Sequence, residues 1–281
     1  MEVNAIHNTG STQPLATIGS ATIQLKPDAQ PVIQGARKLA FRLHDPVAKE
    51  LDRMVAKGII ERVTGPTKWL SPIVVARRKN GKPRICGDFR RLNESIRRER
   101  FVIPPADTFF ANLHGAKVFS TLDLESGFNQ IGLDTASADL TMIATHRGNY
   151  HYLRLPFGIS SAPEIFQRIM ADHLADLEGC LVYIDDILVV GKDIDEHNRR
   201  LKAVLARIKM IGAKLNQAKC KYAQRKLVYL GHTISEEGVS PDTEKISEAL
   251  SMDPPSTVGE ARRILGMLNY LQRFCLIYLT L

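Results

Sequence analysis

The chain has 281 residues, a net charge of +8 and ordinary proportions of hydrophobic (44%) and charged (24%) residues. This length suits one large or two modest domains. No apolar run reaches the roughly 20 residues of a membrane-spanning helix, and Met1–Asn4 does not open a signal peptide. The four cysteines lack the close spacing of a zinc site or a disulfide framework. We therefore expect an intracellular protein that does not contact membranes.

The amino-terminal region precedes any clear periodicity. Residues 1–35 are rich in Thr, Gln, Pro and Gly and predict an extension or linker. Asp45, followed by a proline, predicts a helix N-cap, and apolar residues at helical spacing continue to Gly58. The folded part of the chain is therefore expected to begin shortly before this helix.

A hairpin is the next expected element. Two β-like runs, 71–76 and 84–86, flank Asn80 and Gly81. Asn-Gly is a strong signal for a tight hairpin turn. Pro83 lacks a backbone N–H and places the second strand at the edge of its sheet.

The rest of the chain alternates strands and helices. A strand is predicted at 118–124, a helix from 160 to the glycine at 179, a second helix over 194–211, a strand pair over 226–234 and a last helix over 256–274. An apolar hairpin around residue 185 lies between the first two helices. This order indicates an α+β fold, with an antiparallel sheet covered by helices on one face.

Positive charge is concentrated in one window. The window from Arg77 to Arg100 contains ten basic and three acidic residues, and this excess accounts for nearly all of the net charge. Such a segment indicates binding to phosphates, either of a nucleic-acid backbone or of a nucleotide. A solvated basic surface without a ligand is the alternative interpretation.

Two adjacent carboxylates, Asp185 and Asp186, lie between the apolar runs 180–182 and 187–190. Anions held together at a partly buried turn repel each other and lose solvation, so they need a compensating cation. Asp123 lies within another apolar run, Val118–Leu124. Three carboxylates in such settings predict a two-metal site for phosphoryl transfer.

These segments resemble the motifs of reverse transcriptases, and of gypsy-like LTR retrotransposons in particular. The matching segments correspond in order to the basic fingers strand, the first catalytic aspartate, the segment under the nucleotide, the YxDD motif, the primer-grip hairpin and the end of the thumb. They are Arg84–Asn93, Thr121–Ile131, Leu155–Gln167, Tyr183–Asp186, Tyr229–His232 and Leu265–Tyr270. Each motif is weak by itself, but their shared order is specific.

The resemblance implies a right-hand polymerase with fingers, a ferredoxin-like palm and a partial thumb. Fingers and palm would occupy 36–237, with a core at about 59–237, and the partial thumb or start of the connection would occupy 238–281. The implied activity is that of an RNA-directed DNA polymerase, a nucleotidyltransferase that extends a primer 3′-hydroxyl with dNTPs on an RNA or DNA template.

The resemblance also implies a metal site. Asp123, Asp185 and Asp186 would be the catalytic residues and would hold two Mg²⁺ ions, and the main-chain carbonyl of Leu124 would complete the ligand shell. Hard carboxylate oxygens favour Mg²⁺, with Mn²⁺ as a substitute.

Further residues match nucleotide-binding positions of the family. Arg84 would pair with the triphosphate, with Arg78 or Lys79 as a second cation. Phe128 would be the aromatic gate that crowds a ribose 2′-hydroxyl, although a core phenylalanine is the alternative. Phe157 stands where gypsy-like elements carry phenylalanine and retroviral enzymes glutamine.

Template or primer contacts are implied for another set of positions. These positions are Tyr183, Asp88, Arg90, Leu230 and Gly231. For Tyr183 the alternative is a half-buried strand tyrosine without a ligand contact.

The chain is expected to be a fragment of a polyprotein that also carries RNase H and integrase, found in the cytoplasm, a virus-like particle or the nucleus. Two rival functions remain open. One is a catalytically inactive or domesticated nucleic-acid-binding remnant, and the other is an RNA-templated RNA polymerase with the same palm.

Overall fold

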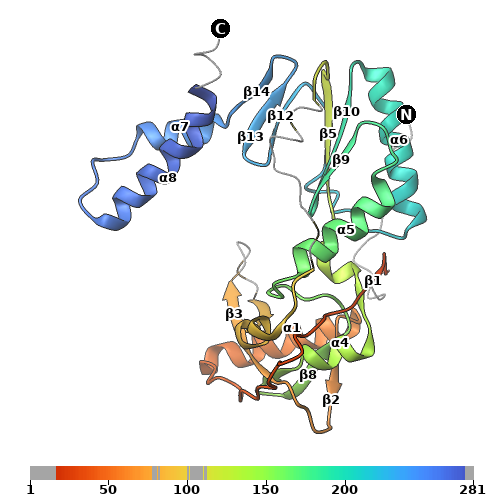
Figure 1. Cartoon of the computed structure of the whole chain (residues 1–281), viewed down its shortest axis with the longest axis vertical. Helices are drawn as coiled ribbons and strands as arrows, with labels where there is room; N and C mark the ends of the chain where they lie inside the picture. Colours follow the sequence, from red (N-terminus) through yellow and green to blue (C-terminus); the bar gives the residue numbers. More distant parts are fainter. Residues whose placement is uncertain are drawn as a thin grey trace.

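The computed structural model describes residues 17–77, 81, 83–99, 101, 110 and 113–275. Figure 1 shows an upper part built around a sheet, with helices α5 (Ala162–Leu174) and α6 (Ile194–Met210) beside it. A lower part contains α1 (His44–Ala56) and α4 (Thr135–Leu140). Helix α5 lies where the two parts meet. Within the described ranges no helix is both long and apolar enough to span a membrane.

The upper part is built on a four-stranded antiparallel sheet with the spatial order β11-β5-β10-β9. Its elements in chain order are β5 (Val118–Asp123), α5 (Ala162–Leu174), β9 (Cys180–Tyr183), β10 (Asp186–Gly191), α6 (Ile194–Met210) and β11 (Lys221–Gln224). This βαββαβ order is the ferredoxin-like arrangement. The predicted α+β class and the ferredoxin-like antiparallel sheet are therefore confirmed.

Side-chain alternation along β10 explains why both faces of this sheet are covered. Ile187 and Val189 pack in the large core formed with α5 and α6, whereas Leu188 and Val190 pack in a second core. All four side chains are at most 4% exposed. Because successive side chains of a strand point to opposite faces, a continuous apolar run is what a strand between two cores requires.

The second core lies against a three-stranded antiparallel sheet, β12-β13-β14. Its strands are β12 (Lys226–Tyr229), β13 (His232–Ser235) and β14 (Gly238–Pro241). Two helices follow, α7 (Thr243–Leu250) and α8 (Val258–Cys275), and they extend away from the central sheet in Figure 1. Helix α8 is joined to the hairpin by the Tyr270 hydroxyl, which donates to the Gly231 carbonyl at 2.5 Å.

The lower part contains a five-stranded sheet with the order β2-β8-β7-β3-β4. Its strands are β2 (Ile60–Val63), β3 (Ser71–Arg77), β4 (Pro83–Gly87), β7 (Ile143–Thr145) and β8 (Gly148–Tyr152). The other elements are η1 (Phe41–Leu43), α1 (His44–Ala56), α2 (Arg90–Ser95), η2 (Gly127–Gln130) and α4 (Thr135–Leu140), with β1 (Ser20–Ala21) paired to β6 (Gly132–Leu133). The predicted hairpin is the antiparallel pair β3-β4, and β4 is the edge strand that Pro83 indicated. Asn80, in the predicted turn of this hairpin, lies outside the described residues.

Three local expectations differ from the structure. Residues 17–35 do not form a loose linker: Ala21 and Ile23 are buried in the main core, because short backbone pairings hold this segment on the body. Asp45 lies inside the first turn of α1 instead of capping it, since η1 runs directly into the helix. Helix α5 ends at Leu174, before the left-handed Gly179.

Candidate active site

The three aspartates meet at one end of the central sheet. Asp186, the first residue of β10, is the register partner of Asp123, the last residue of β5. Asp186 also pairs with Tyr183, so Ile184 and Asp185 form a two-residue turn. The strand lengths and register thus bring a carboxylate 62 positions earlier beside the Asp185-Asp186 pair, as predicted.

A side chain of helix α5 holds the turn that carries Asp185. Ile184 adopts φ 52°, a left-handed conformation that is unfavourable for a β-branched residue. Gln167, only 3% exposed, compensates: its Oε1 accepts from the Ile184 N–H at 2.6 Å and its Nε2 donates to the Val182 carbonyl at 2.9 Å. A buried amide with both ends satisfied fixes the position of the turn.

A second buried amide fixes the loop between α6 and β11. Gln130 is fully buried, and its side chain exchanges hydrogen bonds with the backbone N–H and carbonyl of Lys214 at 2.8 and 2.9 Å. It also donates to the Glu125 carbonyl at 2.9 Å. The Asn216 N–H donates to the Asp123 carbonyl at 2.8 Å. The loop is thereby attached to the segment that carries the first aspartate.

Lys219, in this loop, supplies a positive charge at the carboxylates. Its Nζ lies 3.0 Å from Asp123 Oδ2. Burial, with repulsion from Asp186 and Asp123, raises the pKa of Asp185 to about 6, and the Lys219 charge opposes that shift. Burial and Asp123 likewise raise the pKa of Asp186. Among the described residues, the site therefore holds more negative charge than the ammonium group of Lys219 offsets.

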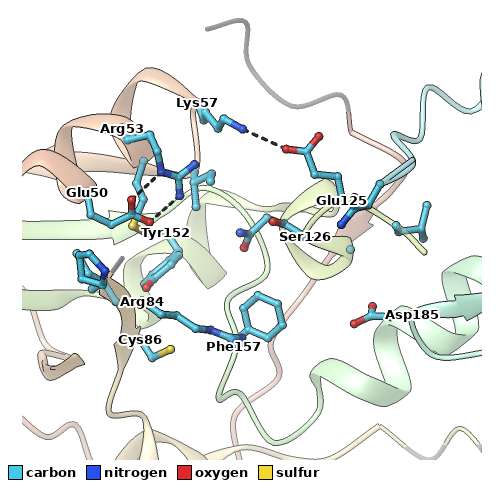
Figure 2. Close-up of a pocket in the computed structure, with 18 of the residues that line it drawn as sticks. Glu50, Arg53, Lys57, Arg84, Cys86, Glu125, Ser126, Tyr152, Phe157 and Asp185 are labelled. Carbon is cyan, nitrogen blue, oxygen red and sulfur yellow. Dashed lines mark hydrogen bonds and ion pairs between the residues drawn. The ribbon is translucent and has the colours of Figure 1, made fainter. Parts of the chain in front are cut away.

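A cavity of about 640 Å³ opens beside the carboxylates. Asp123, Leu124 and Asp185 line one side, and Arg84 and Phe157 line another. Figure 2 shows α1 side chains along the top of the cavity, with Arg84 and Phe157 below and Asp185 to the right. Asp186 and Phe128 are not among the lining residues.

Arg84 and the two phenylalanines form one wall as a stack. The Arg84 guanidinium carbon lies 4.3 Å from the centre of the Phe157 ring, a cation–π contact. Phe157 in turn contacts Phe128, with ring centres 5.0 Å apart. Phe128 is 8% exposed and also packs on Phe166, so it lies behind Phe157 as a core residue. Arg78 and Lys79, the other proposed nucleotide contacts, lie outside the described residues.

The opposite wall contains charges that the sequence did not indicate. On α1, Arg53 makes two 2.7 Å hydrogen bonds to Glu50, while Lys57 Nζ reaches Glu125 at 3.2 Å (Figure 2). Glu125 follows the segment that carries Asp123 and Leu124. The Lys57–Glu125 ion pair therefore joins the lower part of the molecule to the carboxylate-bearing part.

The predicted template and primer residues fall at two places outside the cavity lining. Asp88 is buried and accepts two 2.7 Å hydrogen bonds from Arg90 and a further one from Arg37, and these contacts hold its pKa well below the usual value. Arg90 itself is largely exposed.

The second place is the β12-β13 turn, where Leu230 and Gly231 both have positive φ. Tyr183 and Leu230 pack against the second core. The Tyr229 hydroxyl donates to the Asp186 carbonyl at 3.2 Å, which connects this turn to the aspartate hairpin.

The carboxylates fit a hard divalent cation by their donor chemistry. Asp185 Oδ1 is buried and makes no hydrogen bond, and an anionic oxygen without a partner is costly unless a cation reaches it. Gly127 leaves the space beside this oxygen open, since a Cβ there would lie 2.5 Å from it. Among the described residues, however, no three His, Cys, Asp or Glu side chains are already arranged around a single ion position.

Comparisons with solved structures agree with the overall fold. The foamy viral protease–reverse transcriptase in complex with double-stranded DNA superposes with a TM-score of 0.80 at 23% identity, over 92% of this chain and 44% of that one. A second structure of that protein with double-stranded DNA gives a TM-score of 0.78 at 24% identity, over 92% and 52%. The fold is therefore that of a right-hand polymerase.

The sequence comparisons identify the family. The model of the family described as reverse transcriptase (RNA-dependent DNA polymerase) matches residues 76–234. The Pol polyprotein of transposon opus from Drosophila melanogaster is 37% identical over 81% of this chain, and that of transposon gypsy is 32% identical over 96%. The chain belongs to the reverse transcriptase family, which confirms the resemblance drawn from its motifs. It spans 23% and 27% of the length of these two relatives.

Proposed function

We propose that this chain is the polymerase part of a retrotransposon Pol polyprotein and extends a primer 3′-hydroxyl with dNTPs on an RNA or DNA template. One observation carries the proposal most directly. The register of β5, β10 and β9 gathers Asp123, Asp185 and Asp186, and two of them, Asp123 and Asp185, line a cavity that Arg84 also lines. Acidic metal ligands facing a phosphate-binding arginine are what phosphoryl transfer requires.

The proposed roles follow from where each side chain lies. Arg84, stacked on Phe157, would bind the triphosphate, because a planar guanidinium suits phosphate oxygens. Phe128 would restrict the sugar through the ring of Phe157, which it supports. Asp88 would orient Arg90 toward the template backbone.

Asp123, Asp185, Asp186 and the Leu124 carbonyl would hold two Mg²⁺ ions, or Mn²⁺ in their place. Metal bound there supplies charge that lowers the pKa of an attacking hydroxyl and stabilises a leaving pyrophosphate. The orphaned Asp185 Oδ1 supports this assignment. Arg78 and Lys79 remain candidates for a second triphosphate contact.

The proposal extends to the organisation of the chain. Residues 36–237 would form fingers and palm, and 238–281 the partial thumb. RNase H and integrase modules would accompany this part in the full polyprotein, inside the cell. The chain's coverage of about a quarter of the gypsy polyprotein supports this view.

A primer-extension assay on a homopolymer template tests the function. Wild-type protein with Mg²⁺ or Mn²⁺ should incorporate dNTPs, and Asp185→Asn should abolish incorporation without loss of fold. Salt-sensitive nucleic-acid binding without incorporation would instead identify an inactive binding remnant. Equal use of ribonucleotides and deoxynucleotides would favour an RNA polymerase.

A further inference from the structure

Lys219 is placed at the carboxylates by a built loop. Its own N–H donates to the Asn216 carbonyl at 3.0 Å, and the Asn216 N–H is bound to the Asp123 carbonyl. On either side, Leu215 bridges to Leu124 and Lys221 pairs with Thr121. The backbone that carries Lys219 is therefore held at a fixed distance from the aspartates.

The side chain of Lys219 is more exposed than that of its partner. It is 64% exposed, whereas the Asp123 side chain is 24% exposed. An ammonium group on a flexible, solvated stem can leave its partner at little cost, because an exposed ion pair is weak. The loop thus keeps a cation near the aspartates without fixing it on them.

The ammonium position conflicts with metal binding. The Lys219 Nζ lies against Oδ2 of Asp123, one of the two carboxylate oxygens through which this residue could bind a divalent ion, and its charge also acts on Asp185 and Asp186. Two cations at one carboxylate oxygen repel each other strongly at such short range. Lys219 and a metal ion bound through Asp123 Oδ2 therefore compete for the same oxygen.

We propose that Lys219 is an internal counter-cation, which stabilises the metal-free carboxylates and competes with the divalent metal for Asp123. The inference rests on the proposed metal site. It makes metal loading an exchange of one cation for another, so that the aspartate cluster always has a positive partner.

Binding of Mn²⁺ alone to the full chain, without nucleotide, tests the competition. Lys219→Gln should bind Mn²⁺ about two- to fivefold more tightly than wild type, the range that loss of an exposed ion pair allows. Lys57→Gln is a charge-matched control, because it removes a cation from the same cavity wall but one that pairs with Glu125. Its effect on Mn²⁺ affinity should be clearly smaller.

Thermal unfolding provides a second readout. In EDTA, Lys219→Gln should unfold at a lower temperature than wild type, and saturating Mn²⁺ should remove that difference. An unchanged or weaker Mn²⁺ affinity, or a stability loss that persists with Mn²⁺, would mean that Lys219 merely orients Asp123, and would overturn the proposal. Neither measurement uses primer extension, so an inactive chain can still show competition, and an active one can fail to show it.

Discussion

Gln167 and Ile184 are joined by a 2.6 Å hydrogen bond between the glutamine Oε1 and the backbone N–H of the turn that presents Asp185. The same amide donates to the Val182 carbonyl, on the strand leading into the turn. Helix α5 therefore helps to fix the turn that carries Asp185, through a residue whose two hydrogen bonds go to backbone groups. Ile184, which this hydrogen bond holds, has a left-handed φ of 52°.

Gln167→Leu should lower stability and activity together. The leucine has similar volume but removes both hydrogen bonds, and a buried backbone N–H without its partner costs about 1–3 kcal/mol. The free energy of unfolding in urea should fall by that amount. Gln30→Leu, at an exposed position, is the control and should change stability little. A variant as stable and active as wild type would show that the turn holds its shape without Gln167.

Gly127→Ala should impair the site while leaving the fold nearly intact. The added Cβ would come 2.5 Å from Asp185 Oδ1 and 3.1 Å from Phe166, so the carboxylate must move. A displacement of that kind can reduce turnover on the order of ten- to a hundredfold. The turnover number in steady-state dNTP incorporation measures the effect.

Gly65→Ala is the matched control for this change, because a Cβ at Gly65 meets nothing within 4 Å. Equal turnover in the two variants would contradict the idea that Asp185 must occupy its present position.

Much of the fold was predictable because it depends on local pattern. The apolar runs around Asp123 and Asp185 are long enough to define strands, and Pro83 correctly indicated an edge. The family motifs then predicted that Asp123 would lie beside Asp185 and Asp186 at the ends of these strands.

The supporting contacts were not predictable in the same way. Lys219 reaches Asp123 across 96 positions and Lys57 reaches Glu125 across 68, so only the closed fold brings them together. The position of Gln167, a polar residue within the apolar stretch of α5, was a signal in the sequence. Gln130 gave no such signal, because its partner Lys214 lies in a loop distant in the sequence. Residues 17–35 lack periodicity because they bind the body through isolated backbone pairings.

Asp185→Asn should stabilise the metal-free protein, and more so at higher pH. The folded-state pKa of Asp185, about 6, lies above its ordinary value of 3.8. For such a group the contribution to stability is full below pH 3.8 and is lost as the pH rises through 6. Asparagine carries no charge, so the variant avoids this loss, on the order of 1–3 kcal/mol.

Melting temperatures measured in EDTA at several pH values test this prediction. The advantage of Asp185→Asn over wild type should be small near pH 4 and should grow toward pH 7. Asp28→Asn, at an exposed position, should track wild type throughout. An advantage independent of pH would show that ionisation of Asp185 does not strain the fold.

Arg84→Lys tests whether the stack on Phe157 positions the triphosphate contact. Lysine keeps the charge but loses the planar group that lies 4.3 Å from the ring centre and can bind two phosphate oxygens at once. The KM for dNTP should rise about two- to fivefold, the worth of a partly exposed cation–π contact. Phe157→Leu removes the other partner, and the double variant should add little to either single change. Fully additive effects would mean that Arg84 and Phe157 act on the nucleotide independently.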